Sequence, residues 1–410
     1  CEDSYSPTIL RGKQRTTEKN HDCFYVQMTG IWKPVWLEYR SHTYLDSVRY
    51  STDIKRKTLG IHFIVKNVTK EIQLQTEISL NGNVVVTSEE KIFCEEGDIA
   101  VCFMRRGVKN CFWGLNGGLY DIVLRIKHGE EIIDEVFSYF GMREISVRGN
   151  AVCLNNTILH QKLILYQGIW KDRLYSDPDD ETIVKELTSI KNLGFNGIRV
   201  HEKIESERFL YFADRMGLLV WCEIPSAYEN TPVMQENYIR EMPVILKQKA
   251  NHPCIITWVL FNESWGIGEI GVDKNIRRFA DAMYYLAKSV DETRPVIVND
   301  GWEHTLCDIL TIHNYAQSAE ELYTSCEDAC RDPDSTQCAA KKRLFVKGYQ
   351  YRGQPVIVSE FGGCAFDADT GNGWGYGASV HDSADFLKRM SDLYTALYKN
   401  RGLSGNCYTQ

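Results

Sequence analysis

Two glutamates, each directly after a run typical of a buried strand, are the residues in this sequence best suited to acid and base chemistry. Glu263 follows the apolar, β-prone run 255–261, and Glu360 follows the run 355–359. Two carboxyls that flank a glycosidic bond can hydrolyse it, because the protonated one donates to the leaving oxygen while the ionised one attacks the anomeric carbon. A separation of about 5–5.5 Å leads to retention at that carbon and about 6.5–9.5 Å to inversion. The sequence predicts that Glu263 and Glu360 form such a pair, but it does not give the distance between their carboxyl groups.

Taken singly, either glutamate is more simply explained as a solvated loop residue after a core strand. A catalytic role therefore depends on whether the surrounding helices and strands bring the two glutamates together. Strand-like runs begin near residues 163, 195, 218, 255, 295, 309, 355 and 403, and helical spacing covers 179–193, 206–216, 235–250, 274–289 and 383–399. This alternation predicts a (β/α)8 TIM barrel over residues 147–410, truncated at its last helix. The doubly wound alternative needs a phosphate loop after its first strand, and Gln167–Trp170 does not supply one.

The predicted strands nearly all end in a hydrogen-bonding or ionisable side chain, which a ligand with many hydroxyls requires. These residues are Tyr166, Arg199, His201, Glu223, Asn262, Glu263, Asn299, Asp300, His313, Tyr315 and Glu360. Arg199 and Tyr315 are candidates for keeping Glu360 ionised. Trp265, Trp302 and Trp374 lie past strand ends, where each is either a wall for an apolar sugar face or a core residue.

Two further segments precede the predicted barrel. Residues 44–146 alternate apolar and polar side chains over several short runs, with turn signals at Asn81–Gly82, Glu96–Gly97 and Gly117–Gly118. This pattern predicts an immunoglobulin-like β-sandwich. Residues 1–43 contain the strand-like runs 24–26 and 31–38, too few for a sheet of their own, and are interpreted as the tail of a β domain.

The composition narrows the class of function. The chain has 410 residues and a net charge of −8, which argues against nucleic acid or anionic membrane as a main partner. No apolar run approaches the roughly 20 residues that span a bilayer. Cys1–Ser4 do not resemble a signal peptide, so a cytoplasmic location is expected. Cys326, Cys330 and Cys338 cluster without the spacing of a structural zinc site, which disfavours zinc.

Competing catalytic motifs are incomplete. His201–Glu205 lacks the second histidine of the zinc-protease pattern HExxH. The glycine-rich run Gly371–Gly377 is better interpreted as a loop over the site than as a nucleotide loop, since no helix follows it at once. No nucleophile elbow of the GxSxG type is present, and His313 has no clear nucleophile partner.

Five segments together resemble glycoside hydrolase family two, which includes β-galactosidases, β-glucuronidases and β-mannosidases. They are Thr29–Glu38 (the end of a jelly-roll domain), Phe140–Ile145 (the exit of an immunoglobulin-like domain), and the barrel segments Gly194–His201, Trp258–Ser264 and Val358–Gly362. The resemblance implies that Glu263 is the acid/base, that Glu360 is the nucleophile of a retaining mechanism and that Asn262 holds the sugar 2-hydroxyl. Arg199, His313 and Tyr315 match positions around the sugar less closely, and Tyr166 stands where the family often has aspartate.

These observations predict a retaining exo-β-glycosidase, galactosidase-like, that acts on a carbohydrate without a required cofactor. A mono- or divalent cation near the site, a homo-oligomer, and a β-glucuronidase or β-mannosidase specificity stay open. A catalytically inactive barrel that binds carbohydrate is the alternative from another class, and the presence of Asn262, Glu263 and Glu360 argues against it.

Overall fold

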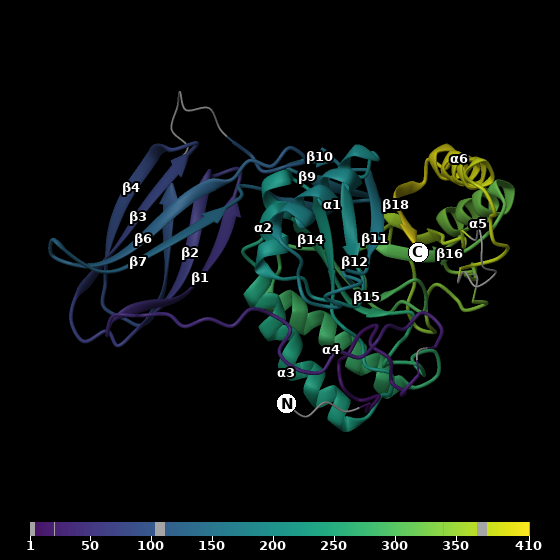
Figure 1. The fold of residues 1–410 in the computed structure, drawn as a ribbon, viewed down its shortest axis with the longest axis horizontal. Helices are drawn as coiled ribbons and strands as arrows, with labels where there is room; N and C mark the ends of the chain where they lie inside the picture. Colours follow the sequence, from purple (N-terminus) through teal and green to yellow (C-terminus); the bar gives the residue numbers. More distant parts are fainter. Residues whose placement is uncertain (1–4, 20, 103–110, 339, 367–374, 410) are drawn as a thin grey trace.

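The computed structural model describes residues 5–19, 21–102, 111–338, 340–366 and 375–409. A β-sandwich and an α/β barrel lie side by side, and an N-terminal segment runs from the sandwich across the barrel (Figure 1). Within the described residues, no helix is long and apolar enough to cross a bilayer.

Eight parallel strands form the barrel, in the order predicted from the sequence. They are β11 (Gln161–Tyr166), β12 (Gly197–Val200), β13 (Leu219–Glu223), β14 (Ile255–Asn262), β15 (Val296–Asp300), β16 (Leu310–Asn314), β17 (Val356–Gly362) and β18 (Leu403–Thr409). The sheet order β15-β14-β13-β12-β11-β18-β17-β16 leaves one seam, between β15 and β16. At this seam the Gly301 amide donates to Thr311 Oγ1 at 3.1 Å, so the barrel is nearly closed.

Six helices of the described chain cover the barrel, and their ends follow from local sequence. They are α1 (Asp180–Asn192), α2 (Glu207–Met216), α3 (Pro232–Lys249), α4 (Lys274–Val290), α5 (Ala319–Arg331) and α6 (Ser383–Lys399). Asp179 caps α1 by accepting from the Thr182 amide, and Gly217 ends α2 in the left-handed conformation. Helix α5 is an addition to the helices that the sequence predicts. Cys326, Cys330 and Cys338 form no metal-binding group among the described residues.

Residues 44–140 form two antiparallel sheets that share one apolar core. One sheet contains β1 (Tyr44–Asp53), β2 (Thr58–Lys66) and β5 (Glu96–Cys102), and the other contains β4 (Asn83–Ile92), β3 (Ile72–Leu80), β6 (Tyr120–His128) and β7 (Glu131–Phe140). The turn expected at Glu96–Gly97 is wrong, since both residues belong to β5. A Cβ on Gly97 would meet Phe63 Cζ at 2.9 Å, so this glycine permits close packing. That the sandwich is immunoglobulin-like stays a prediction.

A small sheet and a buried polar network connect the sandwich to the barrel. The small sheet consists of β8 (Ile145–Arg148), β9 (Ala151–Leu154) and β10 (Thr157–Ile158). In the network, Asp214 of α2 accepts from Tyr139 Oη of β7 at 2.9 Å and from the Cys254 amide at 2.7 Å. His252 Nδ1 lies 2.6 Å from the same carboxylate. The carboxylate is completely buried, so it depends on these partners.

We expect Asp214→Ala to lower the free energy of unfolding by about 3–5 kcal/mol, because it removes one of the two carboxylates that pair with the buried His252 and leaves Tyr139 Oη and the Cys254 amide without their acceptor. Burial alone would lower the pKa of His252, but Asp214 and Glu207 raise it to about 9. Urea unfolding measures the change. The matched control is Asp98→Ala, whose side chain is 81% exposed, and it should change stability by less than about 0.5 kcal/mol. Equal effects of the two substitutions would contradict the network's role.

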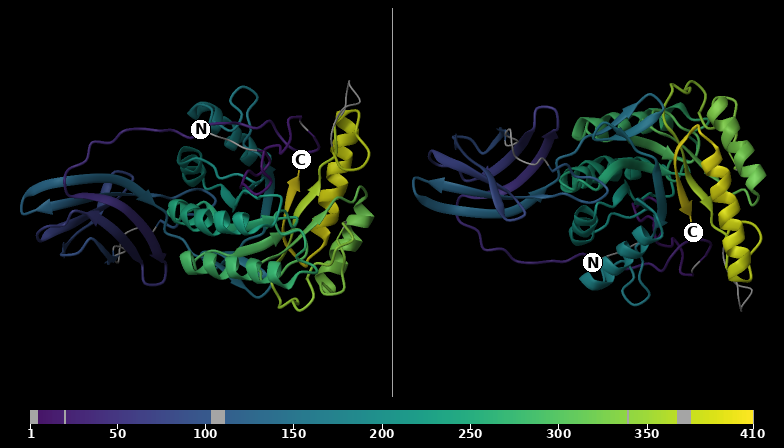
Figure 2. Two further views of the ribbon diagram at one scale, coloured as in Figure 1. Left: turned by 90° about the horizontal axis from the view of Figure 1, so that it is seen from below. Right: turned by 90° about the horizontal axis from the view of Figure 1, so that it is seen from above.

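The described residues before Tyr44 contain no strand, so the strands expected at 24–26 and 31–38 are wrong. Some backbone hydrogen bonds of this segment are internal, such as the one from the Tyr25 amide to the Lys13 carbonyl, and others join it to barrel loops. The amides of Arg11 and Gly12 both donate to the Ser226 carbonyl at 3.1 Å, and the Tyr228 amide donates to the Pro7 carbonyl at 2.7 Å. The segment therefore follows the rim of the barrel (Figure 2), and its assignment to a jelly-roll domain stays a prediction.

Candidate active site

Glu263 begins the loop after β14 in an uncommon backbone conformation. Glu263 and Ser264 have φ values of +49° and +64°, a left-handed region that side chains other than glycine seldom adopt. The Ser264 amide donates to Asn299 Oδ1 and its hydroxyl to Glu303 Oε2, both at 2.8 Å. The Glu263 amide donates to the Asp300 carbonyl at 3.0 Å. The turn is thus fixed by its neighbours, as strained functional residues require.

Arg199 of β12 is completely buried and organises the carboxylates around it. Its guanidinium donates to Glu360 Oε1 at 2.6 Å, to Glu223 Oε2 at 3.0 Å and to Asn262 Oδ1 at 2.8 Å. It also forms an ion pair with Asp300 at 2.9 Å. Burial alone would lower the pKa of Arg199, yet Asp300, Glu223 and Glu360 raise it well above its ordinary value. Four residues from four strand ends thereby share one cation.

Glu360 is held in the ionised form. Burial would raise the pKa of its carboxyl, but His313, Arg199 and the Tyr315 hydroxyl lower it below its ordinary value. His313 has a pKa raised to about 10, because Glu360 and Asp300 outweigh the effect of burial, so it carries a positive charge at neutral pH. A nucleophilic carboxylate needs this kind of stabilisation.

Tyr315 lies between the two glutamates. Its hydroxyl is 2.6 Å from Glu360 Oε2 and 3.0 Å from Glu263 Oε1. One oxygen of each glutamate and one ring nitrogen of His313 all lie within 4.8 Å of one another, a group that could also hold a metal ion. Tyr376 stacks on the Tyr315 ring at 3.5 Å between centroids. Because a hydroxyl carries one proton, Tyr315 can donate to one carboxyl and accept from the other.

We expect Tyr315→Phe to lower kcat/KM by roughly 10- to 100-fold, which is the cost of one hydrogen bond to a charged group. The pKa of Glu360 should rise, so the acid limb of the pH profile should move to higher pH. The pH dependence of kcat/KM measures both effects. Tyr285→Phe, on the exposed face of α4, is the control. An unchanged acid limb would show that Tyr315 does not support the ionised form of Glu360.

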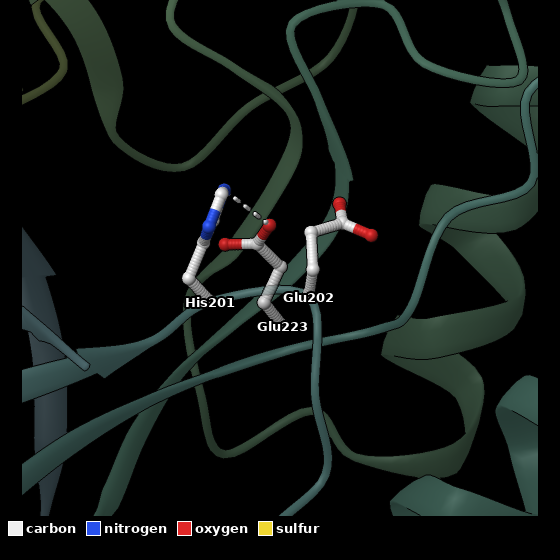
Figure 3. A group of neighbouring side chains, drawn as sticks. All are labelled: His201, Glu202 and Glu223. Atoms are coloured by element: carbon white, nitrogen blue, oxygen red, sulfur yellow. Dashed lines mark ion pairs between the residues drawn. The ribbon is translucent and has the colours of Figure 1, made fainter. Parts of the chain in front are cut away.

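A second cluster of possible metal ligands lies beside Arg199 and is drawn in Figure 3. His201, Glu202 and Glu223 have one ligand atom each within 4.8 Å of the others. Burial raises the pKa of Glu223 well above its ordinary value. Glu202 accepts from the Ser226 amide at 2.6 Å. The Glu202 carboxylate is thus bonded by Ser226, whereas Glu223 Oε1 is buried and makes no hydrogen bond among the described residues.

The structure brings most of the predicted site residues together, and it departs from the sequence at Tyr166. Tyr166 is not at the mouth, because its hydroxyl donates to Glu186 of α1 at 2.6 Å, on the outside of the barrel. Trp302 is only 7% exposed and packs edge-on against His313. Trp374 lies outside the described residues, as do Gly371–Gly373 of the glycine-rich loop. Trp265 lies 6.0 Å from His201 between ring centroids.

Two residues near the site are absent from the set predicted from the sequence. Thr409, at the end of β18, donates its hydroxyl to Glu360 Oε2 at 3.1 Å. Lys13 belongs to the N-terminal segment, and its ammonium lies 5.3 Å from the Trp265 ring centroid. Thr409 was available from the rule that barrel strands end at the site. No comparable rule places a lysine that lies 250 residues away from Glu263 in the sequence.

A parallel (β/α)8 barrel with two facing glutamates at its carboxyl-terminal mouth places this chain in the class of glycoside hydrolase barrels. The family comes from comparison with known proteins. Residues 155–391 match the model described as "Glycosyl hydrolases family 2, TIM barrel domain", so the chain belongs to glycoside hydrolase family 2.

Individual relatives are distant. A β-glucuronidase from Streptococcus agalactiae is 22% identical over 85% of this chain and 59% of its own length. A β-galactosidase from Thermoanaerobacter pseudethanolicus is 24% identical over 90% of this chain and 52% of its own length. The chain thus spans about half the length of these curated relatives.

Solved structures share the fold. A GH2 β-galacturonidase from Eisenbergiella tayi superposes with a TM-score of 0.70 at 18% identity, covering 90% of this chain and 64% of the other. A Bacteroides uniformis β-glucuronidase gives a TM-score of 0.71 at 18% identity, with 90% and 46% covered. At this identity the likeness supports the fold alone.

Proposed function

We propose that the chain is a retaining exo-β-glycosidase in which Glu263 is the acid/base and Glu360 the nucleophile. The observation that carries the proposal is the approach of these two carboxyls, one oxygen of each lying within 4.8 Å of the other. Retaining enzymes hold the pair about 5–5.5 Å apart, whereas inverting enzymes need about 6.5–9.5 Å to admit a water.

The environments of the two glutamates support different roles. Glu360 is 4% exposed and surrounded by Arg199, His313 and Tyr315, which favour its ionised form. Glu263 has an 18% exposed side chain, so it is the more accessible of the two carboxyls, as a residue that exchanges protons with a leaving group and with water must be. Asn262 has its amide oxygen fixed by Arg199, and its amide NH₂ is proposed to donate to a sugar 2-hydroxyl.

In this mechanism Glu360 attacks the anomeric carbon while Glu263 gives its proton to the leaving oxygen, which yields a glycosyl ester on Glu360. A water that is deprotonated by Glu263 then cleaves the ester. The backbone of the N-terminal segment bonds to Ser226 in the loop after β13, and a terminal sugar is the proposed substrate. A galactosidase-like preference is the starting hypothesis, and relatives named β-galactosidase and β-glucuronidase both match.

The test is turnover of a panel of 4-nitrophenyl β-glycosides by the 410-residue chain, with the anomer of the first product read by NMR. We expect turnover of at least one sugar and a β-anomer as the first product. An α-anomer would overturn the retaining mechanism. No turnover of any sugar, by a chain shown to be folded by circular dichroism, would overturn the enzymatic function in favour of a carbohydrate-binding barrel.

A further inference from the structure

Both ring nitrogens of His313 face carboxyl groups, on opposite sides of the ring. Nδ1 lies 2.7 Å from Glu263 Oε1, and Nε2 lies 3.3 Å from Asp300 Oδ2. Two arrangements of hydrogens satisfy both sides, with Nε2–H facing Asp300 in each. Either Nδ1–H donates to an ionised Glu263, or a protonated Glu263 donates to the Nδ1 lone pair. The two arrangements differ only in the place of one proton along the contact between Nδ1 and Glu263.

The backbone around His313 fixes the position of its ring. The pairing of β16 with β17 changes register between Ile312 and His313, which places His313 opposite Glu360. Irregularities of this kind redirect side chains beside active sites. A Cβ on Gly301 would lie 2.8 Å from His313 Cγ and Nδ1, and Trp302 packs edge-on against the ring. Because the His313 side chain is completely buried, close packing keeps it beside the acid/base.

Asp300 holds the far side of the ring and stays ionised. Its Oδ1 accepts from the Ser359 hydroxyl at 2.7 Å, and its Oδ2 forms an ion pair with Arg199 at 2.9 Å. Burial would raise the pKa of Asp300, but Arg199 and His313 lower it below its ordinary value. The proton on Nε2 therefore stays on the imidazole, and only the proton on Nδ1 can move.

The charges around His313 favour its protonated form. Burial alone would lower the pKa of His313, but Glu360 and Asp300, followed by the hydrogen bond to Glu263, raise it to about 10. Two buried histidines close to it are neutral at neutral pH, because burial lowers the pKa of His201 well below its ordinary value and that of His304 to about 4. The titratable and charged groups around His313 are Glu263 after β14, Asp300 on β15, Glu360 on β17, Tyr315 after β16, Arg199 on β12, His201 after β12, His304 after β15, and Cys338.

We propose that His313 stores the proton that Glu263 delivers to the leaving group, so that the two residues act together as one acid/base. This inference rests on the proposed function and adds to it a residue that acts through Glu263. The His313 side chain is completely buried, whereas that of Glu263 is 18% exposed, so Glu263 is the member of the pair that exchanges protons with the substrate. In the free site the shared proton is on Nδ1, and Glu263 is ionised.

The proton is returned in each catalytic cycle. As the glycosidic bond breaks, the proton moves from Nδ1 to the Glu263 carboxyl and from there to the leaving oxygen, which keeps the electrons of the broken bond and departs as an alcohol. Glu360 supplies the electron pair of the new bond to the anomeric carbon. His313 is then neutral. In the second step the attacking water loses a proton to Glu263, and this proton returns to Nδ1 as the sugar leaves Glu360.

A shared proton makes the pair titrate as a unit. An ordinary glutamate loses its proton near a pKa of about 4.3, whereas the pair should keep one proton until the pH approaches the pKa of His313, about 10. Substrates whose leaving group needs a proton should therefore be hydrolysed well into the alkaline range. A glutamate without a reservoir would lose this ability several pH units lower.

The experiment measures the pH dependence of kcat/KM on a phenyl and a 2,4-dinitrophenyl glycoside of a sugar that the chain hydrolyses. For the parent on the phenyl glycoside, the basic limb should lie at about pH 9 or above. His313→Asn keeps an N–H near the place of Nδ1 but does not titrate. Its basic limb should move down by at least about two pH units, with a loss of roughly 10- to 100-fold at about pH 8. The 2,4-dinitrophenyl glycoside needs no proton and should lose less than about tenfold. His128→Asn, at the exposed end of β6, should match the parent.

Three results would overturn the proton reservoir while leaving Glu263 as the acid/base of a glycosidase. They are a parent basic limb below about pH 7 on the phenyl glycoside, a basic limb that His313→Asn does not move, and a loss in this variant that is equal on both glycosides at every pH. The first of these needs no variant, so it decides the question even if His313→Asn does not fold. No turnover of any sugar by the folded parent would instead overturn the proposed function.

Discussion

Glu360→Gln should abolish turnover, with kcat/KM at least about 10⁴-fold below the parent on every aryl glycoside that the chain cleaves. The amide has nearly the same shape as the carboxylate but cannot form the glycosyl ester. The substitution also removes the negative charge that pairs with Arg199 at 2.6 Å and attracts the charged His313. Steady-state kinetics measures the loss, and it should exceed the effect of any other single substitution at the site.

A mass measurement distinguishes loss of the nucleophile from misfolding. A 2-deoxy-2-fluoro glycoside with a good leaving group should label the parent once, on the peptide that contains Glu360, because the fluorine slows both steps and traps the ester. Glu360→Gln should stay unlabelled. The control is Glu320→Gln on the exposed face of α5, which should label and turn over like the parent. A label on a different residue would show that this other residue, and not Glu360, is the nucleophile.

The sequence predicts the barrel well because its signals are local and repeated. Each buried parallel strand is a continuous apolar run, and helices such as α1 and α2 carry their own capping residues, Asp179 and Gly217. The strand ends converge on one mouth by geometry alone, so Arg199, Asn262, Glu263, His313, Tyr315 and Glu360 lie together once the eight strands are assigned in order. Their catalytic roles remain a proposal.

Features that depend on the register of a strand, or on contacts between segments distant in the sequence, are predicted poorly from the sequence. Tyr166 faces Glu186 outside the barrel because successive side chains of a strand alternate in direction, and an all-apolar strand does not reveal which residue starts facing inward. The run 31–38 has a strand-like composition, yet no described strand pairs with it, and Val35 and Leu37 stay 77% and 98% exposed. Lys13 reaches the mouth only through the path of the N-terminal segment.

Glu263→Ala should reduce kcat/KM by an amount that depends on the leaving group, which is the signature of a lost general acid. A 2,4-dinitrophenolate departs without protonation, so its glycoside should lose about tenfold or less. A disaccharide or a phenyl glycoside needs the proton and should lose roughly 10²- to 10⁴-fold. Steady-state rates on a series of aryl glycosides give the slope of log kcat/KM against leaving-group pKa, which should be steeper for the variant than for the parent.

Added azide provides the matching test of the second step. Azide needs no general base, so it should accelerate breakdown of the ester on Glu360 in Glu263→Ala and give a β-glycosyl azide, with no such effect in the parent. The contacts of Glu263 explain why its removal should leave the rest of the site in place. Its partners, His313 Nδ1 at 2.7 Å and Tyr315 Oη at 3.0 Å, both retain Glu360 as a second partner. A loss that is equal for all leaving groups and insensitive to azide would assign Glu263 a role other than acid/base.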